Sequence, residues 1–454
     1  MAIQSVQTIP IDGAKKSSRL TLWPLIAATF FMVSGGAYGI EDIVHGAGYG
    51  LAILILFLTP IFWSLPTAFM IGELASALPC EGGYYAWVRR AMGDFWGFQE
   101  AWLSLVASIF DMAIYPTLFV AYLARLFPWF AESHRGVIAG LTVVIVCVGL
   151  NIAGVKVVST TSLWLFFLLS APFVLIVILA PFKYAALLNA ATTPTTSKVN
   201  LVGGVLVAMW NYMGWDNAST IAEEVDRPQR TYPLAMLLSV AIVAASYIVP
   251  VAAVWMTKLP ASAWETGSWA DIAGLLGGSL LRIALVVGGM LSAFGMFNAL
   301  VLSYSRLPLA MAQDGMLPGI FAKLTWTGAP WVAIVFLAAG WGMCLGLGFE
   351  RLITIDILLY GSSLALEFIA LIFLRIREPK LPRAFRVPGG MFGAIAVGIF
   401  PILLLSFSVI RSESERVWGM SSFTLGTILI ALGGVAYFAN YALKPGGWNG
   451  KPSC

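Results

Sequence analysis

The sequence predicts an all-α membrane protein with about twelve transmembrane helices, and three observations support this fold class. Hydrophobic residues make up 59% of the 454 residues, and charged residues only 11%, whereas a typical soluble domain has about 25% charged residues. The mean hydropathy is +0.88. Apolar segments of about 20 residues, the length needed to cross a bilayer, recur along the chain. Because the chain cannot cover a soluble surface with polar residues, its surplus apolar surface must face lipid.

Each apolar segment gives one expected crossing, with a boundary uncertainty of about four residues. The connections between segments are short, polar or marked by Pro and Gly, so no separate soluble domain is expected. Residues 1–20 lack the apolar core of a signal peptide and are interpreted as a tail. The expected crossings begin near Leu22, Leu51, Gly97, Gly136, Val157, Leu201, Leu234, Leu275, Trp331, Leu352, Met391 and Phe423.

Lysine and arginine predict the orientation, because loops rich in these residues stay in the cytoplasm. If the N-terminus is cytoplasmic, 17 of the 26 basic residues fall on the inside and the other 9 on the outside. We therefore expect a multi-pass protein of the cell membrane (inner or plasma membrane), with both termini cytoplasmic.

Two expected helices contain glycines and polar residues in the middle of an apolar run. The first contains SGGAYG at 34–39 and the sixth NYMGWDN at 211–217. Gly35 and Gly214 each lie 13 residues into their helix, which places both near the middle of a bilayer core about 30 Å thick. Small residues for close helix packing are one explanation. Paired interruptions in two halves of a chain are instead typical of a transporter binding site.

Acidic residues inside a bilayer are costly and usually functional. Arg282 is the one basic residue well inside an expected helix, and it lies near an outer end, so the core is net acidic and suits a cation or a proton. Helix capping or distant ion pairs are the alternative, favoured for Glu73, Glu223 and Glu224 near Arg227 and Arg230. The intramembrane acids are Glu41 and Asp42 after the first interruption, Asp111 in the third helix, Asp216 in the sixth, and Asp356 and Glu367 in the tenth.

Other classes of site find little support. Four cysteines show no CxxC spacing, and with two histidines a metal site lacks ligands, so no metal and no cofactor are expected. The net charge of +4 reflects basic loops and does not suggest nucleic acid. No nucleophile–base pair or phosphate-binding loop predicts an enzyme.

Several segments resemble the amino acid–polyamine–organocation superfamily, from about Arg19 to Tyr441. They are the two interruptions, ELASALPCEGGYYAWV from Glu73, the run at 223–228, and RIREPKLPRAFRVP after the tenth helix. Within the superfamily the chain is most similar to plant-type polyamine uptake transporters, on the segments VSGGAYGIED, FWGFQEAW, FDMAIYPTLFVAYL and WDNASTIAEEV.

The resemblance implies two inverted repeats of five helices, at about 21–181 and 201–375, then two helices at about 388–441 and a tail at 442–454. It also implies proton-coupled uptake, with the substrate held by the interruptions and helices 3, 8 and 10. Aromatic residues could add cation–π contacts, although any one of them could equally face lipid or core. The candidate substrate-binding residues are Ser34, Gly35, Gly36, Tyr38, Glu41, Asp111, Tyr115, Trp210, Tyr212, Gly214, Trp215, Asp216 and Tyr360. The candidate coupling residues are Asp42, Asp111, Glu367 and Ser292.

One feature departs from the superfamily pattern. Many proton-coupled members carry a lysine midway along the fifth helix, but residues 163–179 contain none, and Lys156 lies too early. A carboxylate is therefore a candidate to carry the proton. Ser292 and Ser303 are possible sodium ligands and leave the coupling ion open.

Three functions are compatible with these patterns. The leading interpretation is proton-driven import of polyamines or related cationic amines, which the net-acidic core favours. The second is an amino acid permease of the same fold, in which the backbone of residues 34–36 would bind an α-carboxylate. The third, an amine-binding membrane sensor, would usually carry a long soluble domain, which is not expected here. The sequence leaves the oligomeric state open.

Overall fold

The computed structural model describes residues 21–79, 82–154, 158–183, 200–411 and 416–442. Within these residues the only strands form a two-stranded antiparallel ribbon, β1 (Arg416–Val417) and β2 (Met420–Ser421). Nine helical stretches of this part of the chain are long and apolar enough to cross a membrane, and two shorter apolar helices accompany them. The structure confirms the predicted all-α membrane fold.

The helices account for twelve crossings, of which the first and sixth are interrupted as predicted. The first consists of α1 (Leu22–Val33) and the start of α2 (Glu41–Thr59), and the second of the rest of α2, the π-helical turn η1 (Pro60–Ser64) and α3 (Leu65–Ala77). The sixth consists of α9 (Leu201–Asn211) and the 3₁₀ segment η4 (Trp215–Glu224). The others are α5 (Asp94–Leu126), α6 (Ser133–Ile152), α7 (Val158–Leu179), α10 (Pro228–Met256), α11 (Trp269–Gln313), α12 (Trp331–Met343), α13 (Phe349–Arg377), α14 (Gly390–Arg411) and α15 (Ser422–Ala442).

Two helices begin clearly earlier than hydropathy predicts. The seventh crossing starts at Pro228 rather than near Leu234, because proline is well tolerated in the first helical turn, and the polar first turn adds no hydropathy. Helix α11, which contains the eighth crossing, starts at Trp269 rather than near Leu275, and it is bent at Gly278, which has φ 76°. The first turns of α11 therefore form a separate short arm ahead of the crossing itself.

Glu41 and Asp42 follow the first interruption, as predicted, and occupy the first turn of α2. A carboxylate in a first helical turn interacts favourably with the free N–H groups there. The non-helical stretch of the first crossing is therefore confined to residues 34–40.

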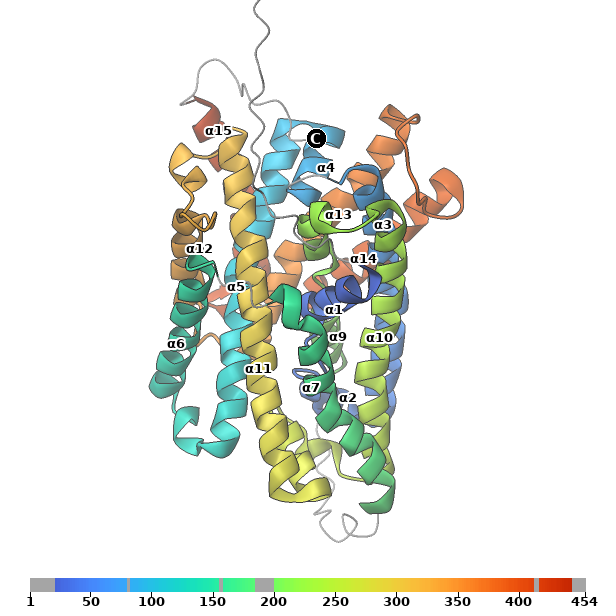
Figure 1. Cartoon of the computed structure of the whole chain (residues 1–454), viewed down its shortest axis with the longest axis vertical. Helices are drawn as coiled ribbons and strands as arrows, with labels where there is room; N and C mark the ends of the chain where they lie inside the picture. Colours follow the sequence, from blue (N-terminus) through green and yellow to red (C-terminus); the bar gives the residue numbers. More distant parts are fainter. Residues whose placement is uncertain (1–20, 80–81, 155–157, 184–199, 412–415, 443–454) are drawn as a thin grey trace, which may run out of the picture.

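Helices α5 and α11 run side by side through the middle of the molecule (Figure 1). α5 also packs along α13. These two helices are antiparallel, since Arg90, just before α5, pairs with Glu378 after the end of α13. Large apolar side chains on α7 and α14 face outward, for example Trp164 and Phe392, which are 79% and 81% exposed. These surfaces fit contact with lipid.

One end of the molecule, the α4 end, is held by ion pairs around α4 (Gly83–Met92). Arg89 contacts Asp94 at 2.7 Å and Asp314 at 2.6 Å. The Arg90 guanidinium pairs with Glu378 and lowers the pKa of that carboxyl. The buried Glu73 pairs with two arginines, which are Arg375 and Arg383 rather than Arg227 or Arg230. The last turn of α15 also reaches this end.

The opposite end, the η2 end, carries the 3₁₀ turn η2 (Pro128–Ala131) and the short turn η5 (Ala261–Ala263). Here Arg125 pairs with Glu265 and Asp271, and Asp271 also pairs with Arg282. The intramembrane arginine noted in the sequence thus lies in this cluster, away from the interruptions. The remaining short turns are η3 (Ala180–Lys183) and η6 (Gly319–Ala322).

The predicted orientation assigns the α4 end to the cytoplasm, and cysteine labelling tests it. Ser133 at the η2 end and Ala384 at the α4 end are both exposed. In a background with Cys80 and Cys454 replaced by alanine, we expect a membrane-impermeant maleimide to label Ser133→Cys in intact cells. Ala384→Cys should be labelled only after permeabilisation. The reverse pattern would contradict the orientation.

Candidate substrate site at the two helix interruptions

The first interruption, residues 34–40, is made of backbone conformations that favour glycine. Gly35, Gly36 and Gly39 have φ values of 59°, 115° and 87°, in the region that side-chain-bearing L-residues rarely adopt. A Cβ atom at Gly35 would lie 2.4 Å from the hydroxyl of Ser292. Glycine is therefore needed at position 35 both for its backbone angles and for close approach of α11.

The backbone groups released by this interruption are bound by polar side chains, two of them from the distant helix α11. Ser292 of α11 donates a hydrogen bond to the Gly35 carbonyl at 2.7 Å. The indole of Trp269, at the start of α11, donates to the Ala37 carbonyl at 2.7 Å. Ser34 accepts from the Gly36 N–H through its own side chain at 3.2 Å. These bonds replace helical ones, as membrane depth requires.

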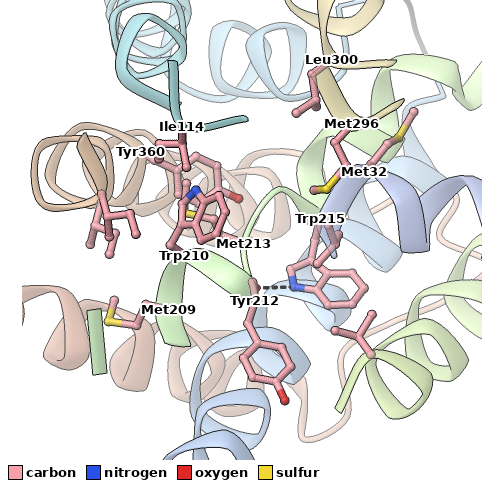
Figure 2. Close-up of a cluster of buried hydrophobic side chains, with 14 of the residues drawn as sticks. Met32, Ile114, Met209, Trp210, Tyr212, Met213, Trp215, Met296, Leu300 and Tyr360 are labelled. Carbon is pink, nitrogen blue, oxygen red and sulfur yellow. Dashed lines mark hydrogen bonds between the residues drawn. The ribbon is translucent and has the colours of Figure 1, made fainter. Parts of the chain in front are cut away.

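The second interruption, residues 212–214, separates α9 from η4, and Gly214 has φ 87°. The Gly214 N–H donates to the hydroxyl of Tyr360 at 3.1 Å. The Tyr212 carbonyl accepts from the indole of Trp215 at 2.7 Å, the bond drawn in Figure 2. The Asn211 carbonyl accepts from Tyr247 of α10 at 2.9 Å. This interruption is thus anchored to α10 and α13.

The two interruptions touch each other. The amide of Asn211 donates to the Gly39 carbonyl at 3.3 Å. A Cβ atom at Gly214 would lie 3.1 Å from the Met32 carbonyl. The structure therefore brings together two segments far apart in the sequence, which the depth argument had placed at the same level.

Asp111 of α5 lies at this level, is 3% exposed, and is surrounded by neutral donors. Its Oδ1 accepts from Tyr115 at 3.1 Å and from the indole of Trp210 at 3.2 Å, and its Oδ2 accepts from Tyr304 at 3.1 Å. Tyr304, on α11, escaped the sequence analysis because one tyrosine among 14 gave no signal of its own. Three helices therefore converge on one carboxyl group.

Asp216, 4% exposed, is held differently. The Tyr360 hydroxyl donates to its Oδ1 at 2.6 Å, and the same hydroxyl accepts the Gly214 N–H. A single side chain of α13 therefore links this carboxyl group to the unwound backbone beside it.

Further carboxyl groups are buried near these two. Asp356 and Glu367 of α13 are fully buried, and none of their four carboxyl oxygens has a hydrogen-bond partner in the described structure. Glu100 of α5, also fully buried, accepts a hydrogen bond from Ser363. Within the described residues, none of the five acids Glu100, Asp111, Asp216, Asp356 and Glu367 forms an ion pair. The centre thus holds acids without compensating cations, as the sequence indicated for Asp111 and Asp216.

Side chains of the second interruption point in different directions (Figure 2). Trp210 and Met213 lie toward Tyr360 and Ile114, whereas Trp215 lies toward Met32 and Met296. The hydroxyl of Tyr212 donates to the Leu56 carbonyl at 2.9 Å, away from both aspartates. Of the aromatic candidates, Trp210, Tyr115 and Tyr360 therefore adjoin the carboxyl groups, and Tyr212 and Trp215 support the backbone.

Tyr38, Glu41 and Asp42 lie apart from the aspartates. The Glu41 carboxyl accepts from Tyr122, from Gly39 N–H at 2.6 Å and from Gly267 N–H at 3.1 Å, so protein donors occupy both of its oxygens. Tyr38 packs edge-on against Tyr122 at 5.2 Å. Asp42 accepts from Thr266 at 2.7 Å and lines a cavity of about 280 Å³. These groups connect the first interruption to the η2 end.

Comparison with known proteins identifies the family. The model of the amino acid permease family matches residues 26–441. The chain belongs to the amino acid permease family. Polyamine transporter RMV1 of Arabidopsis thaliana is 34% identical, over 88% of this chain and 81% of its own length. Polyamine transporter PUT1 of Oryza sativa subsp. japonica is also 34% identical, over 92% and 76%. The serine/threonine exchanger SteT of Bacillus subtilis is 28% identical, over 82% and 84%.

Membership makes this chain a secondary transporter of the membrane rather than an enzyme. Within the family fold, the side of the fifth crossing that faces the first interruption is apolar. Phe166 packs on Phe30 with ring centres 4.8 Å apart, and Phe173 packs on Tyr38 at 5.0 Å. Aromatic residues, and no lysine, therefore meet the first crossing at these two positions of α7.

The possible sodium ligands have protein partners. Ser292 donates to the Gly35 carbonyl, and Ser303 donates to the side-chain oxygen of Asn217 at 2.9 Å. Ser292 therefore joins α11 to the first interruption, and Ser303 joins it to η4, which follows the second.

The conformation of Gly36 predicts that a side chain there will stop transport. Gly36→Leu would place a branched side chain against the ring of Tyr38, 3.2 Å from the added Cβ. We expect transport in proteoliposomes to be abolished while the protein stays monodisperse. Gly48→Leu is the matched control, because Gly48 also has positive φ (73°) but open space around it. Normal transport by Gly36→Leu would contradict this prediction and would show that Gly36 serves only helix packing.

Proposed function

We propose that this permease imports polyamines or related cationic amines across the cell membrane, driven by protons, with both termini in the cytoplasm. The proposal rests on one observation above all: Asp111 and Asp216 are buried beside the two interruptions and are held only by neutral donors. A buried carboxylate without a cation is costly, and an ammonium group would supply the missing partner.

The surroundings of the two aspartates suit an alkylammonium ligand. Trp210 and Tyr115 lie beside Asp111, and Tyr360 beside Asp216. Aromatic faces attract cations and also pack against methylene groups. The two carboxyl groups interact electrostatically with each other. A ligand with two ammonium groups could therefore neutralise both, as a polyamine would.

The relatives agree with this substrate class, since RMV1 and PUT1 are named polyamine transporters. The second candidate is an amino acid, supported by the likeness to the serine/threonine exchanger. An α-carboxylate would need free N–H groups at residues 34–36. The Gly35 N–H is bonded to the Phe30 carbonyl and the Gly36 N–H to Ser34, and this favours the amine over the amino acid.

Removing the charge of each aspartate separates the two candidates. Asp216→Asn keeps the shape of the side chain, and we expect it to weaken spermidine binding by about 2–4 kcal/mol, as for loss of one partner of a desolvated charge pair. Asp111→Asn should do the same, or uncouple uptake from pH if Asp111 carries the proton. Binding of a neutral amino acid should change little. Scintillation-proximity binding to the purified variants measures both ligands.

The matched control for these variants is Asp271→Asn, which alters an acid paired with Arg125 and Arg282 at the η2 end. Its affinity for spermidine should equal that of wild type. Unchanged spermidine binding in both Asp111→Asn and Asp216→Asn would refute the assignment of these acids as the amine site.

The coupling ion is tested separately. Because the fifth crossing lacks the lysine and both candidate sodium ligands hold protein groups, we expect an inward proton gradient to stimulate uptake. Replacing sodium with choline at constant pH should leave uptake unchanged. The measurement is labelled spermidine uptake into proteoliposomes with imposed gradients. A requirement for sodium would contradict proton coupling and direct attention to Ser292 and Ser303.

A further inference from the structure

Helices α5 and α13 carry their acids in register. The hydroxyls of Ser104 on α5 and Ser363 on α13 lie 2.9 Å apart, and Ser363 also donates to Glu100. Because the helices are antiparallel, a step of four residues from each serine toward the α4 end leads to Glu100 on one helix and Glu367 on the other. The same register places Asp111 level with Asp356. An acid of α5 is therefore level with an acid of α13 at two depths: Glu100 with Glu367, and Asp111 with Asp356.

The two levels are well separated along the helices. Eleven residues part Glu100 from Asp111, and eleven part Asp356 from Glu367, which corresponds to about 16 Å at 1.5 Å per residue. Asp216 interacts electrostatically with acids of both levels. The glutamate pair therefore lies on the α4 side of the aspartates that the proposed substrate site uses.

The glutamate pair has fewer hydrogen-bond donors around it than Asp111 has. Both oxygens of Glu367 and Oε2 of Glu100 are buried without a hydrogen-bond partner, and the two carboxyl groups interact with each other. Two carboxylates that repel each other in a low-dielectric site favour the uptake of a proton by one of them. A carboxylic acid can donate to its neighbour, which would satisfy an oxygen that is otherwise unpartnered.

We propose that Glu100 and Glu367 form the site of the coupling proton, separate from the substrate site and built from facing positions of α5 and α13. The inference rests on the proposed proton-coupled amine transport. One carboxylate takes up a proton from one side of the membrane, and the resulting acid releases it to the other side. A diammonium substrate neutralises Asp111 and Asp216 but leaves the glutamate pair, so a proton bound to the pair lowers the remaining negative charge before the centre closes.

Tyr84, at the start of α4, connects the two sites. It is 1% exposed, bonds to Ser104, and interacts electrostatically with Asp216, Glu100 and Glu367. A cation bound at Asp216 would therefore change the electrostatic environment of Tyr84 and of the glutamate pair together.

Few other charges face the pair in the described structure. Tyr84 of α4, Asp216 of η4 and Tyr360 of α13 interact electrostatically with it. The sequence of α15 contains no charged residue, and that of α14 contains only Arg411 at its far end. On α3 the one charged residue, Glu73, is neutralised by Arg375 and Arg383. The pH dependence of transport is therefore expected to follow the glutamates.

The experiment compares wild type with Glu100→Gln and Glu367→Gln in proteoliposomes containing a pH-sensitive dye. Labelled putrescine is the probe, and its binding, its counterflow at equal pH and its uptake under an inward proton gradient are measured. We expect both variants to bind putrescine within threefold of wild type and to retain counterflow. Gradient-driven accumulation and substrate-dependent internal acidification should fall at least tenfold. Glu378→Gln, which alters the Arg90 pair at the α4 end, should behave as wild type.

The outcomes separate the two levels of inference. If wild type itself shows no proton-driven uptake, the proposed coupling is wrong. If wild type is proton-driven and both glutamine variants remain so, the glutamate pair is not the proton site. A folded variant that loses putrescine binding more than tenfold would make its glutamate a ligand of the amine and overturn the proposal. If neither glutamine variant is monodisperse, Glu367→Asp is measured instead. A pH profile of uptake identical to that of wild type would then overturn the proposed proton site.

Discussion

Backbone N–H and C=O groups released inside a membrane must be bound by protein, because lipid offers no hydrogen-bonding partners. This constraint shapes the centre of the permease. Two crossings lose their helical bonds at residues 34–40 and 212–214. Side chains from α10, α11 and α13 replace those bonds, through Tyr247, Ser292 and Tyr360. The interruptions therefore determine which faces of the surrounding helices must carry polar residues, and they hold these helices around one point.

The same polar residues create the chemistry of the site. Tyr360 accepts the Gly214 N–H and donates to Asp216 with one hydroxyl. A ligand that binds Asp216 competes with or strengthens this bond, so it alters the support of the unwound backbone at the same time. Ser292 similarly joins α11 to the first interruption. Ligand binding and helix movement are thus linked through hydrogen bonds of the interruptions, as alternating access requires.

The sequence predicted the features that depend on depth along a single helix. Hydropathy located the twelve crossings, and the count of residues from each helix start placed both interruptions and Asp111 at one level. It could not predict which way a side chain points around the helix axis. Tyr212 and Trp215 were grouped with Tyr360, yet they bond to backbone carbonyls instead. Their orientation depends on neighbouring helices, about which hydropathy carries no information.

Relations between helices were missed for the same reason. Glu100 lies only six residues after the start of α5, so a count along one helix suggests an end residue in contact with water. Its burial becomes visible only when α13 is placed beside it, with Ser363 and Glu367 at the same level. Likewise, Glu367 was one of four coupling candidates named from the sequence, and the antiparallel register of α5 and α13 pairs it with Glu100, which the sequence analysis did not single out.

In the part of the chain that the structure describes, the central acids form no ion pairs, and neutral hydroxyl and indole groups bind Glu100, Asp111 and Asp216 instead. An arginine at this position would neutralise a carboxylate permanently and with full hydrogen bonding, and the site could no longer respond to a cationic ligand. Hydroxyl donors stabilise the carboxyl group without cancelling its charge, so both a proton and an ammonium group can still bind. The permanent ion pairs of the described structure lie at the two ends instead, for example Arg89 with Asp314. Charged groups are thus paired with each other at the two ends of the molecule. At the centre, the carboxyl groups stay available to a substrate that must bind and dissociate.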